Sequence, residues 1–158
     1  MTKSDEQRYK ENMLNIQEIF DTVTTHLLTQ RAKSAVPNTD GEKYGESKLT
    51  CLYRHPDGLT CAVGCLIKDE FYETRLEGLR TTSDDVLRSL TDSGVDVDSD
   101  NVRSLLRELQ GVHDDEPVEE WDLQLSRLQS YFQLDEPKML YEALQVRREL
   151  DKNRRAKV

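Results

Sequence analysis

The feature that most constrains this chain is a repeat of apolar side chains every three or four residues. The clearest stripe has spacings of 3, 4, 3 and 4 and comprises Val118, Trp121, Leu125, Leu128 and Phe132. This is the period of an α-helix with one buried face. Similar stripes are predicted for helices within residues 16–27, 86–90, 102–109 and 139–150, the last carrying Met139, Ala143, Val146 and Leu150. The chain is therefore predicted to be mainly α.

One segment is predicted to form a small β-hairpin, near residues 49–60, and not a helix. Residues 49–53 contain strand formers, and the sequence His-Pro-Asp-Gly at 55–58 is typical of a turn. We expect a return strand to Thr60 and a helix from Cys61. A length of 158 residues suits one domain, α+β at most. We predict a flexible segment at 1–12, a compact helical domain at 13–134 and a basic helix at 135–158.

Charge is abundant and unevenly distributed along the chain. Apolar residues make up 35% and charged residues 34%, and the net charge is −9. Residues 84–137 hold 15 acids and 4 bases, whereas residues 138–158 hold 7 bases and 3 acids. An acidic body does not grip nucleic acid phosphates directly, so we expect a protein partner instead. The predicted interaction surface comprises Asp114, Asp115, Glu116, Glu119, Glu120 and Asp122.

Location and cofactors follow from what the sequence lacks. Its start has no apolar signal region, and its longest apolar run, residues 61–67, is far shorter than the ~20 residues a bilayer needs. We expect a cytoplasmic protein with no membrane partner and three reduced cysteines. No nucleotide, dinucleotide or metalloprotease motif is present, so no cofactor is predicted. The sequence leaves open whether the chain forms a homo-oligomer.

Two chemical alternatives involve the cysteines. Four soft ligands within 15 residues, Cys51, His55, Cys61 and Cys65, offer a zinc set at the hairpin. The competing interpretation is that these thiols are buried as small apolar side chains. Cys61 at a helix start, with His113 and Asp114 as base and orienting group, offers a Cys–His hydrolase or transferase. Against this, a histidine near a helix end commonly bonds the last free carbonyls.

A third alternative is a protein that sequesters a small nucleotide signal. The ligand would lie in a pocket lined by Tyr53, Arg54 and Arg80, which supply one aromatic ring and two guanidinium groups.

Several short motifs carry a resemblance to a known family. They are Gln17-Glu18-Ile19-Phe20, Tyr53-Arg54, Asp57-Gly58, Cys61-Ala62-Val63-Gly64-Cys65-Leu66-Ile67, Asp69-Glu70, Glu77-Gly78, Leu109-Gln110, His113-Asp114 and Trp121. With these the chain resembles, over residues 16–134, a widespread family of small uncharacterised proteins of tailed phages and prophages. It departs from the family at Lys68, where the family has Pro, and at His55, where it has Gly; the second departure weakens the zinc hypothesis.

The resemblance implies a setting, the host cytoplasm, and no particular activity. Small acidic phage proteins often act on the host cell. We therefore expect a non-enzymatic accessory protein that binds and modulates a host protein, as an inhibitor of host defence, through its acidic or nucleic-acid-mimicking surface. The nucleotide-sequestering protein and the Cys–His enzyme are the alternatives.

Overall fold

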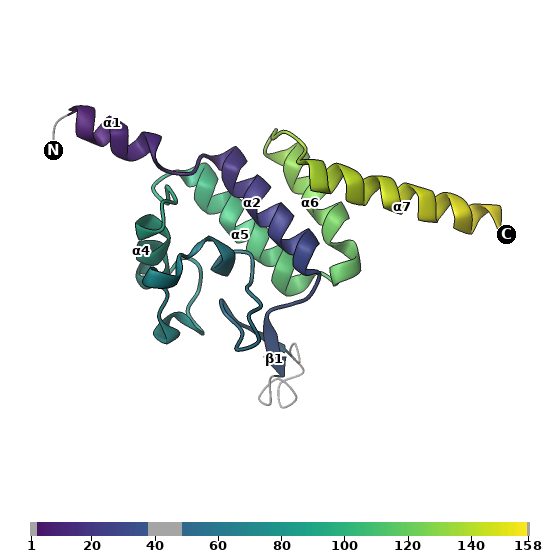
Figure 1. The fold of residues 1–158 in the computed structure, drawn as a ribbon, viewed down its shortest axis with the longest axis horizontal. Helices are drawn as coiled ribbons and strands as arrows, with labels where there is room; N and C mark the ends of the chain where they lie inside the picture. The colour runs from purple at the N-terminus through teal and green to yellow at the C-terminus, as the bar shows by residue number, and fades with distance from the viewer. Residues whose placement is uncertain (1–2, 38–48, 158) are drawn as a thin grey trace.

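The computed structural model describes residues 3–37 and 49–157, and within them the protein is mainly α-helical with one two-stranded antiparallel sheet. The predicted fold class is thus confirmed. Four helices form the centre: α2 (Ile16–Gln30), α5 (Asp100–Asp115), α6 (Trp121–Tyr131) and α7 (Lys138–Ala156). Helix α2 contacts the other three, and α6 contacts both α5 and α7 (Figure 1). Their apolar stripes supply most of the core, as helical periodicity predicts.

Local signals in the sequence set where these helices begin and end. Asn15 and Glu18 form a reciprocal capping box at the start of α2, which satisfies free N–H groups there. Ser83 caps α4 (Asp84–Asp92) and Ser99 caps α5, both as expected from serine at those positions. Gly94 follows α4 with a φ of 93°, a left-handed conformation that favours glycine.

The predicted stripes are buried where the helices pack on one another. Ile19, Phe20, Val23 and Leu27 of α2 are fully buried, as are Trp121 and Leu125 of α6. In α5, Val102, Leu105, Leu106 and Leu109 are all buried. Between α5 and α6, Pro117 begins the one-turn helix η4 (Val118–Glu120), so α6 starts at Trp121 and not at Pro117.

The sheet lies elsewhere than predicted. Strand β2 (Leu49–Cys51) pairs with β1 (Ala35–Pro37) rather than with residues 59–60. The expected turn at 55–58 is present, but it is closed by an isolated bridge between Arg54 and Thr60. Ser34 explains the difference: its carbonyl accepts from Leu52 N–H at 2.8 Å, and this long-range contact leaves no local signature.

No α-helix begins at Cys61, which corrects that prediction. Residues 61–79, here called the irregular segment, contain only the short helices η1 (Gly64–Leu66), η2 (Asp69–Phe71) and η3 (Thr74–Leu76). Cys61, Ala62, Val63, Leu66 and Ile67 are nevertheless buried. A Cβ on Gly64 would overlap the carbonyl oxygen of Tyr53 and lie 2.9 Å from its carbon. The backbones are so close that only glycine fits.

The two ends of the chain extend from opposite ends of the molecule (Figure 1). Helix α1 (Lys3–Glu11) occupies the segment predicted to be flexible, and its residues from Asp5 onward are exposed. Helix α7 buries Leu140 and Ala143, but Val146 and Leu150 are 59% and 55% exposed, contrary to the inward stripe predicted there. Among the helices described, none combines the length and apolar character needed to cross a membrane.

Candidate functional site

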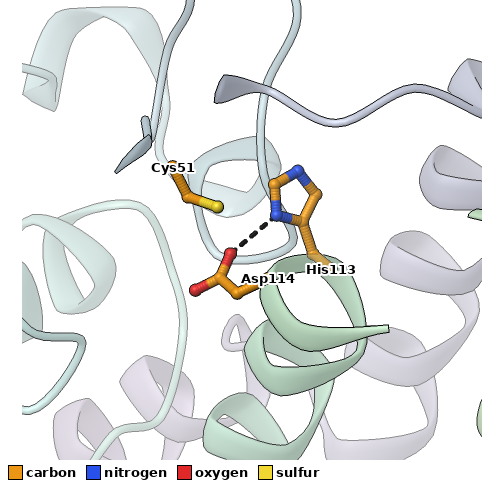
Figure 2. Close-up of side chains that lie close together, drawn as sticks. All are labelled: Cys51, His113 and Asp114. Atoms are coloured by element: carbon orange, nitrogen blue, oxygen red, sulfur yellow. Dashed lines mark hydrogen bonds and ion pairs between the residues drawn. The ribbon is translucent and has the colours of Figure 1, made fainter. Parts of the chain in front are cut away.

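One cluster of side chains with metal-binding or catalytic chemistry occurs in the described residues: Cys51, His113 and Asp114 (Figure 2). Cys51 ends β2, and the other two lie in the last turn of α5. One ligand atom from each lies within 4.8 Å of the others. This arrangement joins two of the three residues predicted for a Cys–His enzyme to a different cysteine.

The hydrogen bonds of His113 determine where its proton lies. The backbone N–H of Ser34 donates to Nε2 at 3.0 Å, so Nε2 must be an acceptor. The ring proton is therefore on Nδ1, which donates to Asp114 Oδ1 at 2.7 Å. The imidazole is fully buried and stacks on Trp121 with ring centroids 5.6 Å apart. Both nitrogens are therefore hydrogen-bonded, and the ring is also stacked on Trp121.

Asp114 is the centre of this polar cluster. Its Oδ1 also accepts from Gln110 Nε2 at 2.9 Å, and its backbone carbonyl accepts from Lys33 Nζ at 3.1 Å. The thiol of Cys51 lies within 4.8 Å of the same carboxylate. Burial, followed by the charge of Asp114 beside it, raises the pKa of Cys51 to about 12. The thiol therefore stays protonated at neutral pH.

This geometry does not match that of a catalytic triad. A metal ion would bind these groups only in exchange for the Nδ1 proton of His113 and the thiol proton of Cys51. In a catalytic triad the histidine lies between the nucleophile and the acid. Here the carboxylate faces both other groups (Figure 2). The cluster acts as a polar clamp between β2, Ser34 and α5.

Cys61, the predicted nucleophile, lies outside that cluster. Its side chain is 1% exposed, and its sulfur accepts from the Gly64 N–H at 3.2 Å. Burial raises the pKa of Cys61 to about 12. The environment thus favours the thiol, opposite to what an activated cysteine requires.

The predicted zinc ligands do not converge either. Cys51 belongs to the cluster with His113 and Asp114, whereas His55 and Cys65 make separate local contacts. His55 Nδ1 accepts from Asp57 N–H at 3.0 Å, and the Cys65 thiol donates to the Ala62 carbonyl at 3.1 Å. Burial raises the pKa of Cys65 to about 12.

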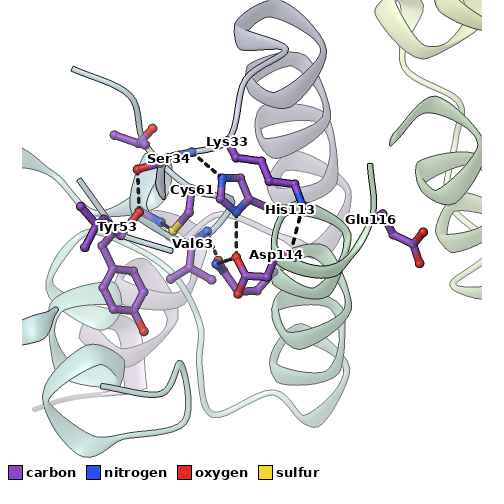
Figure 3. A network of polar contacts seen from close by, with 12 residues as sticks. Lys33, Ser34, Tyr53, Cys61, Val63, His113, Asp114 and Glu116 are labelled. Carbon is purple, nitrogen blue, oxygen red and sulfur yellow. Dashed lines mark hydrogen bonds and ion pairs between the residues drawn. The ribbon is translucent and has the colours of Figure 1, made fainter. Parts of the chain in front are cut away.

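The wider polar network links segments that are distant in sequence (Figure 3). Gln110, which donates to Asp114, accepts from the Val63 N–H at 2.9 Å and so connects α5 with the irregular segment. Ser34 Oγ donates to the Leu52 carbonyl at 2.7 Å. Neither role was predicted, because glutamine and serine on loops or helix faces carry no signal for a partner so far along the chain.

The three residues predicted to line a nucleotide pocket separate into two places. Tyr53 and Arg80 line a cavity of about 730 Å³ beside Asp114, with Arg107 at its edge. Arg54 does not line it. Its guanidinium instead donates to the Ile67 carbonyl at 2.8 Å and pairs with Asp69 at 2.7 Å.

Glu77 holds the backbone at this point, a role the sequence did not reveal. Its carboxylate accepts from the N–H groups of Tyr53 and Arg54, at 2.9 and 3.0 Å, and from the Tyr72 hydroxyl at 2.8 Å. Burial and this contact with Glu77 raise the pKa of Tyr72 to about 12.

The six acids predicted as an interaction surface also separate. Asp114 points into the polar clamp, and Asp122, 7% exposed, binds Arg147 Nε and Nη2 at 2.8 and 2.7 Å. Asp122 is therefore mostly buried by this ion pair, whereas the Asp114 side chain is 32% exposed. Asp115 and Glu116 line a groove between α5 and α6, and Glu119 and Glu120 line one beside α7.

Comparison of the chain with protein-family models, with curated proteins and with solved structures finds no match.

Proposed function

We propose that the chain is a non-enzymatic binding protein that holds a basic, amphipathic segment of a partner protein between α5 and α6. The groove between these helices is the observation that carries the proposal. It has a volume of about 680 Å³ and a lining that includes Val112, Leu128 and Phe132. Tyr131 lies at its rim with 79% of its surface exposed. A groove lined by both apolar and charged side chains suits an amphipathic helix, which has one apolar and one polar face.

The charge around the groove favours a basic partner. Glu108, Asp115 and Glu116 line it, against Arg107 and Arg127. Over residues 84–137, all of which the structure describes, ion pairs with Arg or Lys engage Asp85, Asp100 and Asp122 of the 15 acids. The remaining negative field steers a cationic segment and makes its binding sensitive to salt.

The state of the thiols and of His113 supports a role without catalysis. Cys51, Cys61 and Cys65 are held as thiols, and both nitrogens of His113 have partners. In the setting that the resemblance to phage and prophage proteins implies, the partner is a host protein. Inhibition of a host defence enzyme is the role we propose for that contact.

Binding of a synthetic peptide with lysine and leucine at helical spacing tests the groove directly. We expect wild-type resonances of the α5–α6 groove to shift, with affinity that falls as salt rises. The double variant Glu108→Lys, Asp115→Lys should weaken binding at least tenfold, as should Tyr131→Ala. The matched control Asp96→Lys, Asp98→Lys changes charge equally away from the groove lining.

Two results would overturn the proposal. One is equal loss of affinity in the groove variant and in the control, which would leave only unspecific attraction of charge. The other is capture of a host protein from lysate with a strength that the groove variants do not alter.

A second candidate function rests on the cavity beside Asp114. Because Tyr53 and Arg80 both line it, sequestration of a small nucleotide stays a candidate. A ligand at 100 times its Kd adds about 2.7 kcal/mol of stability, which a thermal-shift screen of nucleotides detects. Arg80→Ala should abolish such a shift, whereas Arg88→Ala, outside the cavity lining, should leave it unchanged. A screen with no shift removes this candidate.

A further inference from the structure

The second half of α7 projects from the body of the molecule (Figure 1). Its buried residues, Leu140 and Ala143, lie near its start, and residues 148–157 are all exposed. A helical stretch of this length is marginal in water without tertiary contacts. A covering surface would therefore stabilise it.

The projecting part of α7 carries an apolar stripe that continues into a groove. Ala143, Val146 and Leu150 line a groove of about 380 Å³ together with Glu119 and Glu120 of η4. Their spacing of 3 and 4 is that of a helix–helix seam. Val146 and Leu150 are 59% and 55% exposed. The stripe is thus half covered by the chain itself and half open.

Charge is arranged with opposite signs at the two ends of this face. Near the root of α7, Glu119 and Glu120 have no ion pair within the described residues, because Arg147 is taken by Asp122 and by the Glu119 carbonyl. Arg31 also lines the root, one base against these two acids. At the tip, Asp151 and Arg154 line the same groove, and Arg155 and Lys157 follow them, so these side chains comprise one acid and three bases.

We propose that this face binds a second copy of the chain, with the two α7 helices antiparallel about a two-fold axis between Val146 and Leu150. A face with acids at one end, bases at the other and apolar groups between is complementary to itself after such a rotation. Arg154 of each copy then lies close to the Glu119–Glu120 end of the other. The α5–α6 groove is not part of this interface, so the dimer is independent of the proposed function.

A single helix pair is at the small end of stable interfaces, so we expect a dissociation constant in the micromolar range, of order 1–100 μM. Sedimentation equilibrium of the full chain over a concentration series tests this. Wild type should pass from monomer to dimer. Leu150→Asp should raise the dissociation constant at least tenfold without unfolding the monomer, since Leu150 is largely exposed.

Tyr141→Asp is the matched control, because Tyr141 is on the same helix, 53% exposed, and does not line the groove. It should leave the dimer intact. Arg154→Glu should weaken the dimer, and adding Glu120→Arg to it should restore at least part of the affinity. That recovery separates a second copy from any other acidic or apolar partner.

A wild-type chain that stays monomeric at every concentration overturns the proposal. A dimer that Leu150→Asp and Tyr141→Asp weaken equally does so as well, as does a monomer whose α7 is covered by a different protein.

Discussion

The irregular segment contributes buried side chains but no α-helix, whereas α7 is a regular helix that is mostly exposed. Residues 61–79 contain no α-helix, yet Cys61, Ala62 and Val63 are at most 1% exposed. Helix α7 is 19 residues long and regular, yet it buries only Leu140 and Ala143. Regular secondary structure therefore does not indicate which parts of this chain form the core.

The difference lies in how each region satisfies its backbone. A helix pairs its own N–H and carbonyl groups, so α7 can project into solvent without leaving its backbone groups unpaired. The irregular segment pairs part of its backbone in short turns and takes further partners from side chains elsewhere in the chain. Gln110 accepts from Val63 N–H, and Ser93 Oγ accepts from Lys68 N–H at 2.9 Å. We expect substitutions in these contacts to be costly and those on projecting α7 to be mild.

Among the glycines that the structure describes, Gly64 is the one whose replacement by alanine should have the largest effect. The new Cβ would overlap the Tyr53 carbonyl, which is backbone and cannot rotate away. We expect a loss of about 3 kcal/mol or more in the free energy of unfolding, or failure to fold. Urea titration followed by circular dichroism measures it.

Gly111→Ala is the matched control, since the same methyl group is added within α5. There the nearest atom to a Cβ is Asp115 Oδ2 at 3.8 Å, an ordinary contact. Alanine favours helix over glycine by up to about 1 kcal/mol, so this variant should be neutral or more stable. Equal stability of the two variants would show that the close approach at Gly64 is not there.

Glu77→Gln should be the next most costly change. The carboxylate accepts from two backbone N–H groups and one hydroxyl, and an amide nitrogen would face at least one donor instead. We expect a loss of about 2–3 kcal/mol, measured by the same titration. Glu70→Gln, at an exposed position, should change stability by less than about 0.5 kcal/mol. A loss of that small size at Glu77 would contradict its role in holding the backbone.

The sequence predicts the regular half of the molecule well and the irregular half poorly, for one physical reason. Stripes and caps are local: Asn15, Ser83 and Ser99 each cap the helix that directly follows them in the sequence. The clamp at Asp114 depends on Cys51, more than sixty residues earlier, and no local pattern encodes that pairing. An apolar stripe also does not show which element covers it, and for this reason Val146 was wrongly predicted to be buried.

Alkaline pH should reveal how the thiols differ between folded and unfolded chains. The pKa of each of Cys51, Cys61 and Cys65 is raised from 9.0 to about 12, chiefly by burial. A raised pKa favours the neutral thiol in the fold. The stability it contributes is complete below about pH 9 and is lost as pH rises towards 12.

Ultraviolet absorbance of the thiolate measures this difference directly. The native protein should show little thiolate between pH 9 and 11, whereas the chain unfolded in guanidinium should titrate near its ordinary pKa of 9.0. The free energy of unfolding should fall over the same range. Native thiolate already present at pH 9 would mean that the sulfurs are open to water.

Leu150→Ala should have the smallest effect, and it sharpens the comparison most. Leu150 is 55% exposed whereas Leu140, on the same helix, is fully buried. Leu140→Ala should cost about 2–4 kcal/mol, since it leaves a cavity against α2 and α6. Leu150→Ala should cost less than about 0.5 kcal/mol when unfolding is measured in dilute solution.

If Leu150→Ala becomes costly only as protein concentration rises, a second copy of the chain covers the apolar stripe of α7. A large cost at every concentration would instead require Leu150 to pack within its own chain, and the contrast between the two regions would fail.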